Sequence, residues 1–472
     1  MKPLRPSVKP LSRIKHLHFV GIGGAGMGGI AEVLLNQGFK ITGSDIHKST
    51  MTERLTSQGA EIFYTHDANN IQGADAVVRS TAISNTNPEI IAAIEHHIPV
   101  VPRAMMLGEL MRFRNGIAIA GTHGKTTTTS LVTSIFAEAG LDPTFVIGGL
   151  LNSAGSNARL GQGDYLIAEA DESDASFLYL HPMMTVVTNI DADHMETYHN
   201  NFDELKKVFI DFIHHLPFYG LAVLCLEDPV VKEILPQISR PFKTYGFDDS
   251  AEFYAKNIKQ IGTLNYFELH RPNKKPLEIT LNLAGEHNVL NALAAIAIST
   301  EAGIDDKSIQ TALKNFGGVG RRLQVYGEYQ TDQGKILLID DYGHHPREIT
   351  ATLNAIRKAW PERRLVMAYQ PHRYTRTRDL FNDFANVLST ADQLLLFDVY
   401  SAGETPIDGA DSKSLVDFMI KHHKIKPILI SPKENLNGIL RSTLKNNDIL
   451  LMQGAGDIGS IANNLATSQL QV

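Results

Sequence analysis

The segment Ile117-Ala-Ile-Ala-Gly-Thr-His-Gly-Lys-Thr126 decides the fold of this chain. Its apolar start predicts a buried strand, Gly116–Ala120, and the residues after the glycine turn have a helical pattern. A glycine turn between a strand and a helix wraps phosphate with its backbone N–H groups, with Lys125 at the β- and γ-phosphates and the Thr126 hydroxyl on Mg²⁺. The strict spacing of such loops fails at Ile119, where a first glycine is expected. The compact Gly-Thr-x-Gly-Lys-Thr version nonetheless predicts ATP binding.

Two groups of acidic residues follow the next predicted strands. Glu169-Ala-Asp-Glu-Ser-Asp174 lies at the end of Tyr165–Ala170, and Asp191-Ala-Asp-His194 follows Thr185–Ile190. Because parallel strands end at one edge of a sheet, these carboxylates are well placed around Mg²⁺. Several of them are expected to cap or position other groups, so only some are metal ligands.

A second glycine motif, Gly21-Ile-Gly-Gly-Ala-Gly26, lies between the predicted strand His16–Val20 and a helix that runs to Gly38. Glycines at this spacing let backbone N–H groups approach a diphosphate, and the helix N-terminus favours its charge. Asp45, about 20 residues on, is suited to accept hydrogen bonds from a ribose. The motif predicts a bound nucleotide of some kind. The alternative is a tight turn that only packs a helix against the sheet.

Gly454-Ala-Gly-Asp-Ile-Gly459 has the same spacing, but it is predicted to be such a turn.

The part of the chain after Arg322 places basic residues after two predicted strands. Asp340-Asp-Tyr-Gly-His344-His-Pro ends Ile336–Asp340, and Gln370-Pro-His-Arg-Tyr-Thr-Arg376 ends Leu365–Tyr369. Both segments should open onto one sheet edge and clamp a carboxylate, because guanidinium groups bind carboxylates with two hydrogen bonds. A solvated basic loop is the alternative. The arginines argue against a zinc site.

Composition and length set the frame for these motifs. The 472 residues divided by about 150 per domain predict roughly three domains, here 1–113, 114–322 and 323–472. Strands alternate with helices throughout, which predicts an α/β fold with parallel sheets. A net charge of −7 lacks the basic surplus typical of nucleic-acid binding, and no stretch is apolar enough for a membrane span.

The single cysteine, Cys225, excludes an internal disulfide and zinc sites with several thiolates. It lies in an apolar run and is predicted to be a buried thiol. The basic start of the chain and the apolar Leu17–Leu35 superficially resemble a signal peptide, but the glycines make a poor apolar helix and the periodic fold continues through it. We therefore expect a cytoplasmic protein without membrane insertion.

Taken together, these motifs resemble the Mur ligase family of cell-wall amide ligases over essentially the whole chain. The resemblance is carried by the glycine motif at Gly21, Gly121-Thr-His-Gly-Lys-Thr, Glu169-Ala-Asp-Glu-Ser-Asp, Asp341-Tyr-Gly-His-His-Pro and Gln370-Pro-His-Arg-Tyr-Thr-Arg-Thr. It implies an N-terminal Rossmann-like UDP-binding domain, a central P-loop ATPase domain and a C-terminal Rossmann-like domain for the amino acid. Within the family, the motifs are most similar to those of members that join L-alanine to UDP-N-acetylmuramate in peptidoglycan precursor synthesis, using ATP and Mg²⁺.

The resemblance also implies roles for individual residues. Lys125 and His194 would be catalytic, and the metal ligands would be Thr126, Glu169 and His194. The ATP-binding residues would be Gly121, Thr122, His123, Gly124, Lys125, Thr126, Thr127, His287, Asn288, Asn291 and Arg322. The UDP-sugar would bind at Gly21, Gly23, Gly24, Gly26, Ser44, Asp45 and His66. The amino acid would bind at Tyr342, His344, His372, Arg373 and Arg376. Several relatives have a carbamylated lysine about 14 residues after the histidine that matches His194, but Val208 stands there, so no carbamylation is predicted.

Three alternatives stay open. The nearest is a recycling ligase that adds a preformed tripeptide to UDP-N-acetylmuramate. An NAD-dependent dehydrogenase would explain the first glycine motif but not Lys125 and Thr126. A nucleotide-gated binding switch would explain the loop predicted to bind ATP, Gly121 to Thr126 (the ATP loop), but not the predicted carboxylate clamp.

Overall fold

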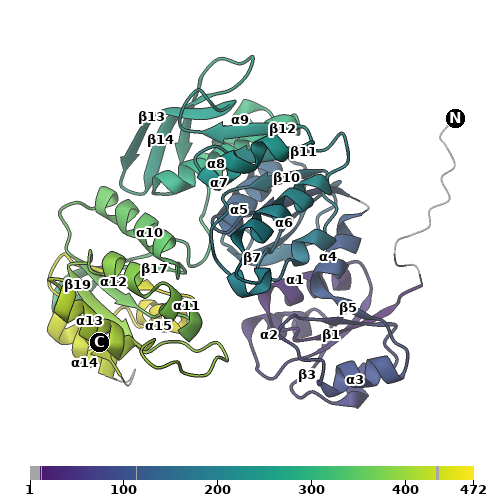
Figure 1. The fold of residues 1–472 in the computed structure, drawn as a ribbon, viewed down its shortest axis with the longest axis horizontal. Coiled ribbons are helices and arrows are strands. Elements are labelled where there is room, and N and C mark those ends of the chain that lie inside the picture. Colours follow the sequence, from purple (N-terminus) through teal and green to yellow (C-terminus); the bar gives the residue numbers. More distant parts are fainter. Residues whose placement is uncertain (1–10, 12, 113, 432–434, 472) are drawn as a thin grey trace. The chain divides into compact units, whose positions relative to one another are not determined.

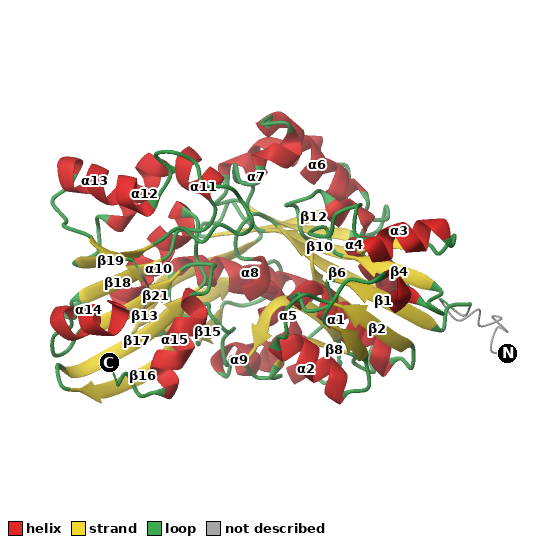
Figure 2. Cartoon of the chain, turned by 90° about the horizontal axis from the view of Figure 1, so that it is seen from below, coloured by secondary structure: helices red, strands yellow, loops and turns green. Residues whose placement is uncertain are grey.

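Each of the glycine-rich motifs follows a strand of a mainly parallel sheet, and helices cover the faces of these sheets (Figure 1; Figure 2). The computed structural model describes residues 11, 13–112, 114–431 and 435–471. The chain divides into two compact units, one of residues up to Asn257 with Phe267–Thr280 and Leu290–Gly317, the other of Ile258–Tyr266, Leu281–Val289 and Gly318 onward. The α/β class with three sheet domains is as the sequence predicts.

The N-terminal sheet has the order β3-β2-β1-β4-β5 and is parallel throughout. Its strands are β1 (His16–Val20), β2 (Lys40–Ser44), β3 (Glu61–Phe63), β4 (Ala76–Arg79) and β5 (Val100–Pro102). The connecting helices are α1 (Ala25–Asn36), α2 (Thr50–Ser57), η1 (Ala68–Ile71), α3 (Pro88–Glu95) and α4 (Arg103–Met111). The strand order reverses at β1, and ligands of open α/β sheets bind outside the carboxyl ends of the strands at such a switch point. The first glycine motif follows β1 directly.

The central sheet has ten strands in the order β15-β14-β13-β12-β11-β10-β6-β9-β7-β8. They are β6 (Asn115–Ala120), β7 (Thr144–Leu151), β8 (Ser156–Arg159), β9 (Tyr165–Glu169), β10 (Met184–Val187), β11 (Leu221–Cys225), β12 (Phe242–Gly246), β13 (Phe253–Ile261), β14 (Leu264–His270) and β15 (Leu277–Leu281). The helices are α5 (Lys125–Glu138), η2 (Ser176–Tyr179), η3 (Met195–Tyr198), α6 (Phe202–His214), α7 (Pro229–Ile234), η4 (Leu235–Gln237), α8 (Glu286–Glu301) and α9 (Asp306–Lys314). Strand β6 lies between β9 and β10, parallel to both. The ATP loop and both acidic groups therefore share one sheet edge.

The C-terminal sheet has the order β16-β17-β21-β18-β19-β20, in which only β16 is antiparallel to its neighbour. Its strands are β16 (Gln324–Thr331), β17 (Gly334–Asp341), β18 (Leu365–Tyr369), β19 (Gln393–Phe397), β20 (Ile428–Ile430) and β21 (Ile449–Gln453). The helices are α10 (Pro346–Ala359), α11 (Tyr374–Asp379), α12 (Phe381–Leu388), α13 (Ser412–His422), α14 (Leu436–Thr443) and α15 (Ile458–Thr467). Alternate strand residues pack against α10, α12 and α13 on one face and against α14 and α15 on the other, which makes a three-layer domain (Figure 2).

Several predicted boundaries and packing roles can be compared with this fold. The strand predicted over Thr185–Ile190 instead spans Met184–Val187, because Thr188 and Asn189 turn away to hold the ATP loop. The turn at Gly454 joins β21 to α15, as predicted. Cys225 is buried in β11, and burial raises the pKa of its thiol to about 11. None of the helices in the described part of the chain is long and apolar enough to cross a membrane.

Candidate functional site

The ATP loop is a tight backbone turn that only glycine fits at two places. Gly121 and Gly124 have φ values of +124° and +85°, and Gly124 caps α5. A Cβ atom on Gly124 would lie 2.6 Å from Asn291 Oδ1, and one on Gly121 would collide with Thr188. The loop is therefore packed between the end of β10 and α8. Asn291, one of the predicted ATP residues, contacts this loop and also accepts a hydrogen bond from Thr128.

Lys125 begins α5, and its ammonium group is fully engaged. It donates to the carbonyl oxygens of Gly121 (2.6 Å) and Thr122 (3.1 Å) and pairs with Glu172 Oε2 (2.7 Å). Burial by itself lowers the pKa of Lys125, but the carboxylates around it, above all Glu172, raise it overall. Burial also raises the pKa of Glu172 to about 7. The lysine is thus a fixed positive charge at the carboxyl edge of the sheet, and Glu172 orients it. The sequence analysis did not assign a role to Glu172.

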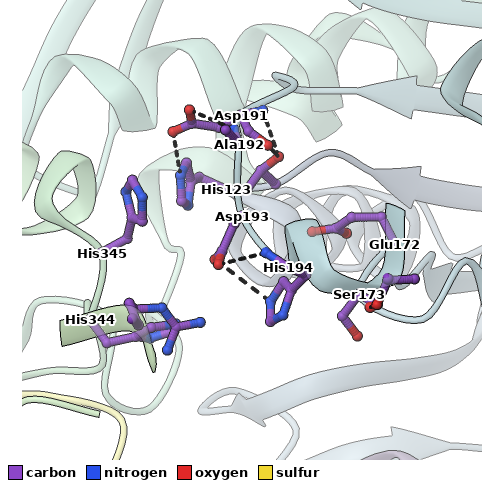
Figure 3. Close-up of polar contacts among 12 residues, drawn as sticks. His123, Glu172, Ser173, Asp191, Ala192, Asp193, His194, His344 and His345 are labelled. Carbon is purple, nitrogen blue, oxygen red and sulfur yellow. Dashed lines mark hydrogen bonds and ion pairs between the residues drawn. The ribbon is translucent and has the colours of Figure 1, made fainter. Parts of the chain in front are cut away.

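The two acidic groups have different roles. The group at the end of β9 offers an oxygen suited to a metal ion, and the group after β10 supports the ATP loop. Glu169 ends β9 next to β6, where its Oε1 accepts from the backbone N–H of Gly148 at 2.8 Å. Thr126 lies buried in the first turn of α5. Asp191, after β10, has its Oδ2 3.2 Å from Nε2 of His123 (Figure 3). Its backbone N–H donates to Thr122 Oγ1 at 2.9 Å.

His194 has a left-handed backbone, with φ +53° and ψ 32°, which is unfavourable for a residue with a side chain. Its backbone N–H donates to Asp193 Oδ1 at 2.9 Å, and its ring Nε2 lies 3.6 Å from Asp193 Oδ2 (Figure 3). A strained residue whose ring faces a carboxylate beside a phosphate loop is typical of a functional position.

The first glycine turn is supported by Asp45, whose Oδ2 accepts from the N–H of Gly23 at 2.8 Å. A Cβ atom on Gly23 would lie 2.8 Å from the same oxygen, so glycine is required for the contact. Gly21 has a φ of +81°, and Gly24 caps α1. One oxygen of Asp45 therefore holds the turn itself, a role that the sequence analysis did not assign to it.

Ser44 and His66 belong to a buried network around Glu89, in the first turn of α3. Glu89 Oε2 accepts from Ser44 Oγ (2.7 Å) and bonds His66 Nδ1 (2.8 Å), and Oε1 accepts from Asn70 (2.7 Å). His18 Nε2 lies 3.4 Å from the same carboxylate. Glu89 is 0% exposed. The structure thus brings two predicted UDP-sugar residues together through a carboxylate that no sequence motif indicated.

The basic residues of the C-terminal domain also meet, as predicted. The ring centroids of His344 and His372 are 5.8 Å apart, and Arg376 Nη1 lies 3.3 Å from His372 Nδ1. Tyr342 stacks edge-on against His344. Arg373 has a φ of +71°, and its N–H donates to the carbonyl of Tyr400.

The sequence analysis missed two partners of this cluster, Tyr400 and Arg321. The Tyr400 ring stacks on His372 at 5.6 Å. The guanidinium groups of Arg321 and Arg322 both lie over the ring of Tyr342, at 5.0 and 5.1 Å. Each partner is separated in sequence from the residue it contacts, so no local motif indicates it.

Three other predictions concern positions outside these clusters. His287 lies at the start of α8, where burial lowers the pKa of its ring to about 4 and keeps it neutral. Asn288 donates to the carbonyl of Ala284 at 2.7 Å. Val208 packs against the core, and Lys206 pairs instead with two surface carboxylates.

Arg103, at the start of α4, was not identified from the sequence. Its Nη2 lies 3.3 Å from Asp171 Oδ2, in the acidic group after β9. Its Nη1 lies 2.9 Å from the position of a Cβ atom on Gly26. The arginine thus connects the first glycine turn to the acidic group beside the ATP loop.

Comparisons with known proteins identify the family of this chain. Models of the Mur ligase family match the catalytic domain at residues 16–115, the middle domain at 119–299 and the glutamate ligase domain at 321–456. The solved UDP-N-acetylmuramate–alanine ligase of Thermotoga maritima is 28% identical, with a TM-score of 0.82, and the match covers 96% of this chain and 98% of that one.

Two further structures share the fold. The murein peptide ligase of Psychrobacter arcticus 273-4 is 24% identical, with a TM-score of 0.73 over 97% of this chain and 99% of that one. The MurF ligase of Thermotoga maritima in complex with ADP is 14% identical, with a TM-score of 0.60 over 92% and 95%. Members of the family are ATP-dependent ligases. With all three domains matched in order, this chain belongs to the Mur ligase family.

Proposed function

We propose that this protein joins L-alanine to the carboxylate of UDP-N-acetylmuramate, with ATP converted to ADP and phosphate. The observation that carries the proposal is the shared edge of the adjacent parallel strands β9, β6 and β10. Glu169 ends β9, Lys125 follows β6 and His194 follows β10. The 28% identity to an alanine-adding ligase supports the choice of substrates. We assign the UDP-sugar to residues 1–113, ATP to 114–322 and the amino acid to 323–472.

In the first step, the muramate carboxylate attacks the γ-phosphate of ATP and forms an acyl phosphate. Lys125 is charged and held by Glu172, so it would stabilise the negative charge on the transferring phosphoryl group. The backbone N–H groups at the start of α5 would bind the other phosphates. Lys125 itself would move little, because its charge is already held at the start of α5.

The residues present fit a magnesium ion. Thr126 and Glu169 offer a hydroxyl and a carboxylate, which are the hard oxygen ligands that Mg²⁺ prefers. His194 is the third proposed ligand, and its geometry is set by Asp193. When bound, Mg²⁺ neutralises charge on the β- and γ-phosphates. Lys125 does the same from the protein side.

In the second step, the amine of alanine attacks the acyl phosphate, the amide bond forms and phosphate leaves. We infer that His344, His372, Arg373 and Arg376 hold the alanine carboxylate, with Tyr342 alongside. Arg376 is 8% exposed and lies against His372. A buried guanidinium gives the clamp its affinity for an anion, because the surrounding protein screens the charge less than water does.

A recycling ligase that adds a preformed tripeptide is the second candidate, because the tripeptide-adding ligase of Neisseria meningitides is 27% identical over 65% of this chain and all of that one, with a TM-score of 0.61. The dehydrogenase alternative leaves Lys125 and Thr126 unexplained, and the switch alternative leaves the carboxylate clamp unexplained. The expected cytoplasmic location and the absence of nucleic-acid and membrane partners stay predictions.

Phosphate release distinguishes the candidates. With ATP, Mg²⁺ and UDP-N-acetylmuramate, the purified protein should release phosphate when L-alanine is added and not when L-alanyl-γ-D-glutamyl-meso-diaminopimelate is added. Mass spectrometry should find UDP-N-acetylmuramoyl-L-alanine. Turnover with the tripeptide alone would overturn the substrate assignment, and phosphate release without any amine would favour the switch.

A further inference from the structure

Arg103 lies between the first glycine turn and the acidic group after β9, and the proposed function gives it no role. It follows β5 as the first residue of α4, and its side chain is 19% exposed. Its Nη2 lies 3.3 Å from Asp171 Oδ2, and its Nη1 lies 2.9 Å from the position that a Cβ atom on Gly26 would take. All three residues belong to one compact unit.

We propose that Arg103 binds the diphosphate of the UDP-sugar and leaves its ion pair with Asp171 when it does so. This inference rests on the function proposed above and adds a specific substrate-binding residue to it. Gly26 lies in the first turn of α1, where the backbone N–H groups have no acceptor within the helix and favour a bound anion. Arg103 adds a full positive charge beside them, in a geometry suited to two phosphate oxygens.

In the ion pair between Arg103 and Asp171, a ligand anion can take the place of the Asp171 carboxylate. Its N–O distance is 3.3 Å, and the Asp171 side chain is 40% exposed. Such partly exposed pairs contribute little to stability. A diphosphate carries more charge than one carboxylate and accepts two parallel hydrogen bonds, so the guanidinium gains by the exchange.

Asp171 also lies next in the chain to Glu172, whose Oε2 pairs with Lys125 of the ATP loop at 2.7 Å. The carboxylate that Arg103 would release is therefore the direct neighbour of the one that holds the lysine.

Binding measurements on the full chain test the proposal. We would titrate UDP-N-acetylmuramate, UDP and ADP into the wild type, Arg103→Ala and Arg103→Lys by calorimetry. Loss of a charge-assisted contact should weaken binding of both uridine nucleotides by about 10- to 100-fold in Arg103→Ala, and lysine should restore part of it. Binding of ADP should change less than about twofold.

Arg54→Ala is the matched control, because Arg54 also joins the N-terminal and central sheets: it pairs with Glu32 of α1 and donates to the carbonyl of Gly155, between β7 and β8. It should leave all three affinities unchanged, and circular dichroism melting should show each variant folded. Unchanged UDP affinity in a folded Arg103→Ala would overturn the inference, as would equal weakening for ADP. Weaker binding of UDP-N-acetylmuramate with unchanged UDP would place the guanidinium on the sugar carboxylate instead. Failure of the wild type to bind UDP-N-acetylmuramate would refute the proposed function itself.

Discussion

Replacing Glu89 with alanine removes a carboxylate that is wholly enclosed in the N-terminal domain. Ser44, His66 and Asn70 lie 2.7–2.8 Å from its oxygens and His18 lies 3.4 Å away. Each buried polar group left without a partner costs about 1–3 kcal/mol, and breaking a buried charged pair costs about 3–5 kcal/mol. Ser44 can still bond His66, and Asn70 can still bond the Thr65 carbonyl. Because these groups keep other partners, we expect the free energy of unfolding to fall by about 3–5 kcal/mol, which is the cost of breaking the charged pair alone.

The loss should depend on pH in a defined direction. Burial by itself raises the pKa of Glu89, but hydrogen bonds from His18, Ser44, Asn70 and His66 lower it below its ordinary value of 4.5. Its contribution to stability is therefore present above pH 4.5 and is lost as pH falls through the folded-state pKa. The stability difference between the wild type and Glu89→Ala should narrow on acidification.

Urea denaturation followed by circular dichroism at pH 7 and at pH 4 measures this difference. Glu53→Ala is the control, since Glu53 is 57% exposed and pairs with the exposed Lys48, a contact expected to contribute less than about 1 kcal/mol. If Glu89→Ala is no less stable than Glu53→Ala at pH 7, the network has no structural importance. A difference that widens at pH 4 would contradict the assigned charge.

Three further predictions concern the remaining parts of the site. Lys125→Ala should abolish ATP-dependent phosphate release while UDP-sugar binding in calorimetry stays within about twofold, and loss of both would undermine the domain assignment. Arg376→Ala should raise the KM for L-alanine about 10- to 100-fold with the KM for ATP unchanged, whereas the exposed Arg378→Ala should change neither. Gly121→Ala should lower the free energy of unfolding by about 1–3 kcal/mol more than Gly140→Ala, because both have positive φ but only Gly121 faces a collision at the end of β10. Equal melting curves for these two glycine variants would refute the packing argument.

The parts of this molecule that the sequence predicts are those encoded by neighbouring residues. β1 and β18 have the predicted bounds, because apolar runs ending at glycine or polar residues fix a buried strand locally. The order of motifs along the chain also predicts the shared edge, since parallel strands all end on the same side of their sheet.

Other features depend on contacts between distant segments and have no local signal. Tyr400 reaches His372 from the loop after β19, and Arg103 reaches Asp171 from another sheet. The β7–β8 hairpin, whose Asn157 donates to the Ala25 carbonyl, was likewise not predicted. Pairing partners of this kind are selected by the tertiary fold, so a motif search cannot find them.

The enclosed thiol of Cys225 has a practical consequence for spectroscopy. With a pKa of about 11 and only 2% of its surface exposed, it will react with maleimides or nitroxides far more slowly than an exposed cysteine at neutral pH. The natural chain therefore serves directly as a background for labelling, and cysteines introduced at exposed sites of the two compact units would carry a dye pair without removal of the native residue. Energy transfer between those dyes, recorded as UDP-sugar, ATP and alanine are added in turn, would report the order in which the units respond to each ligand.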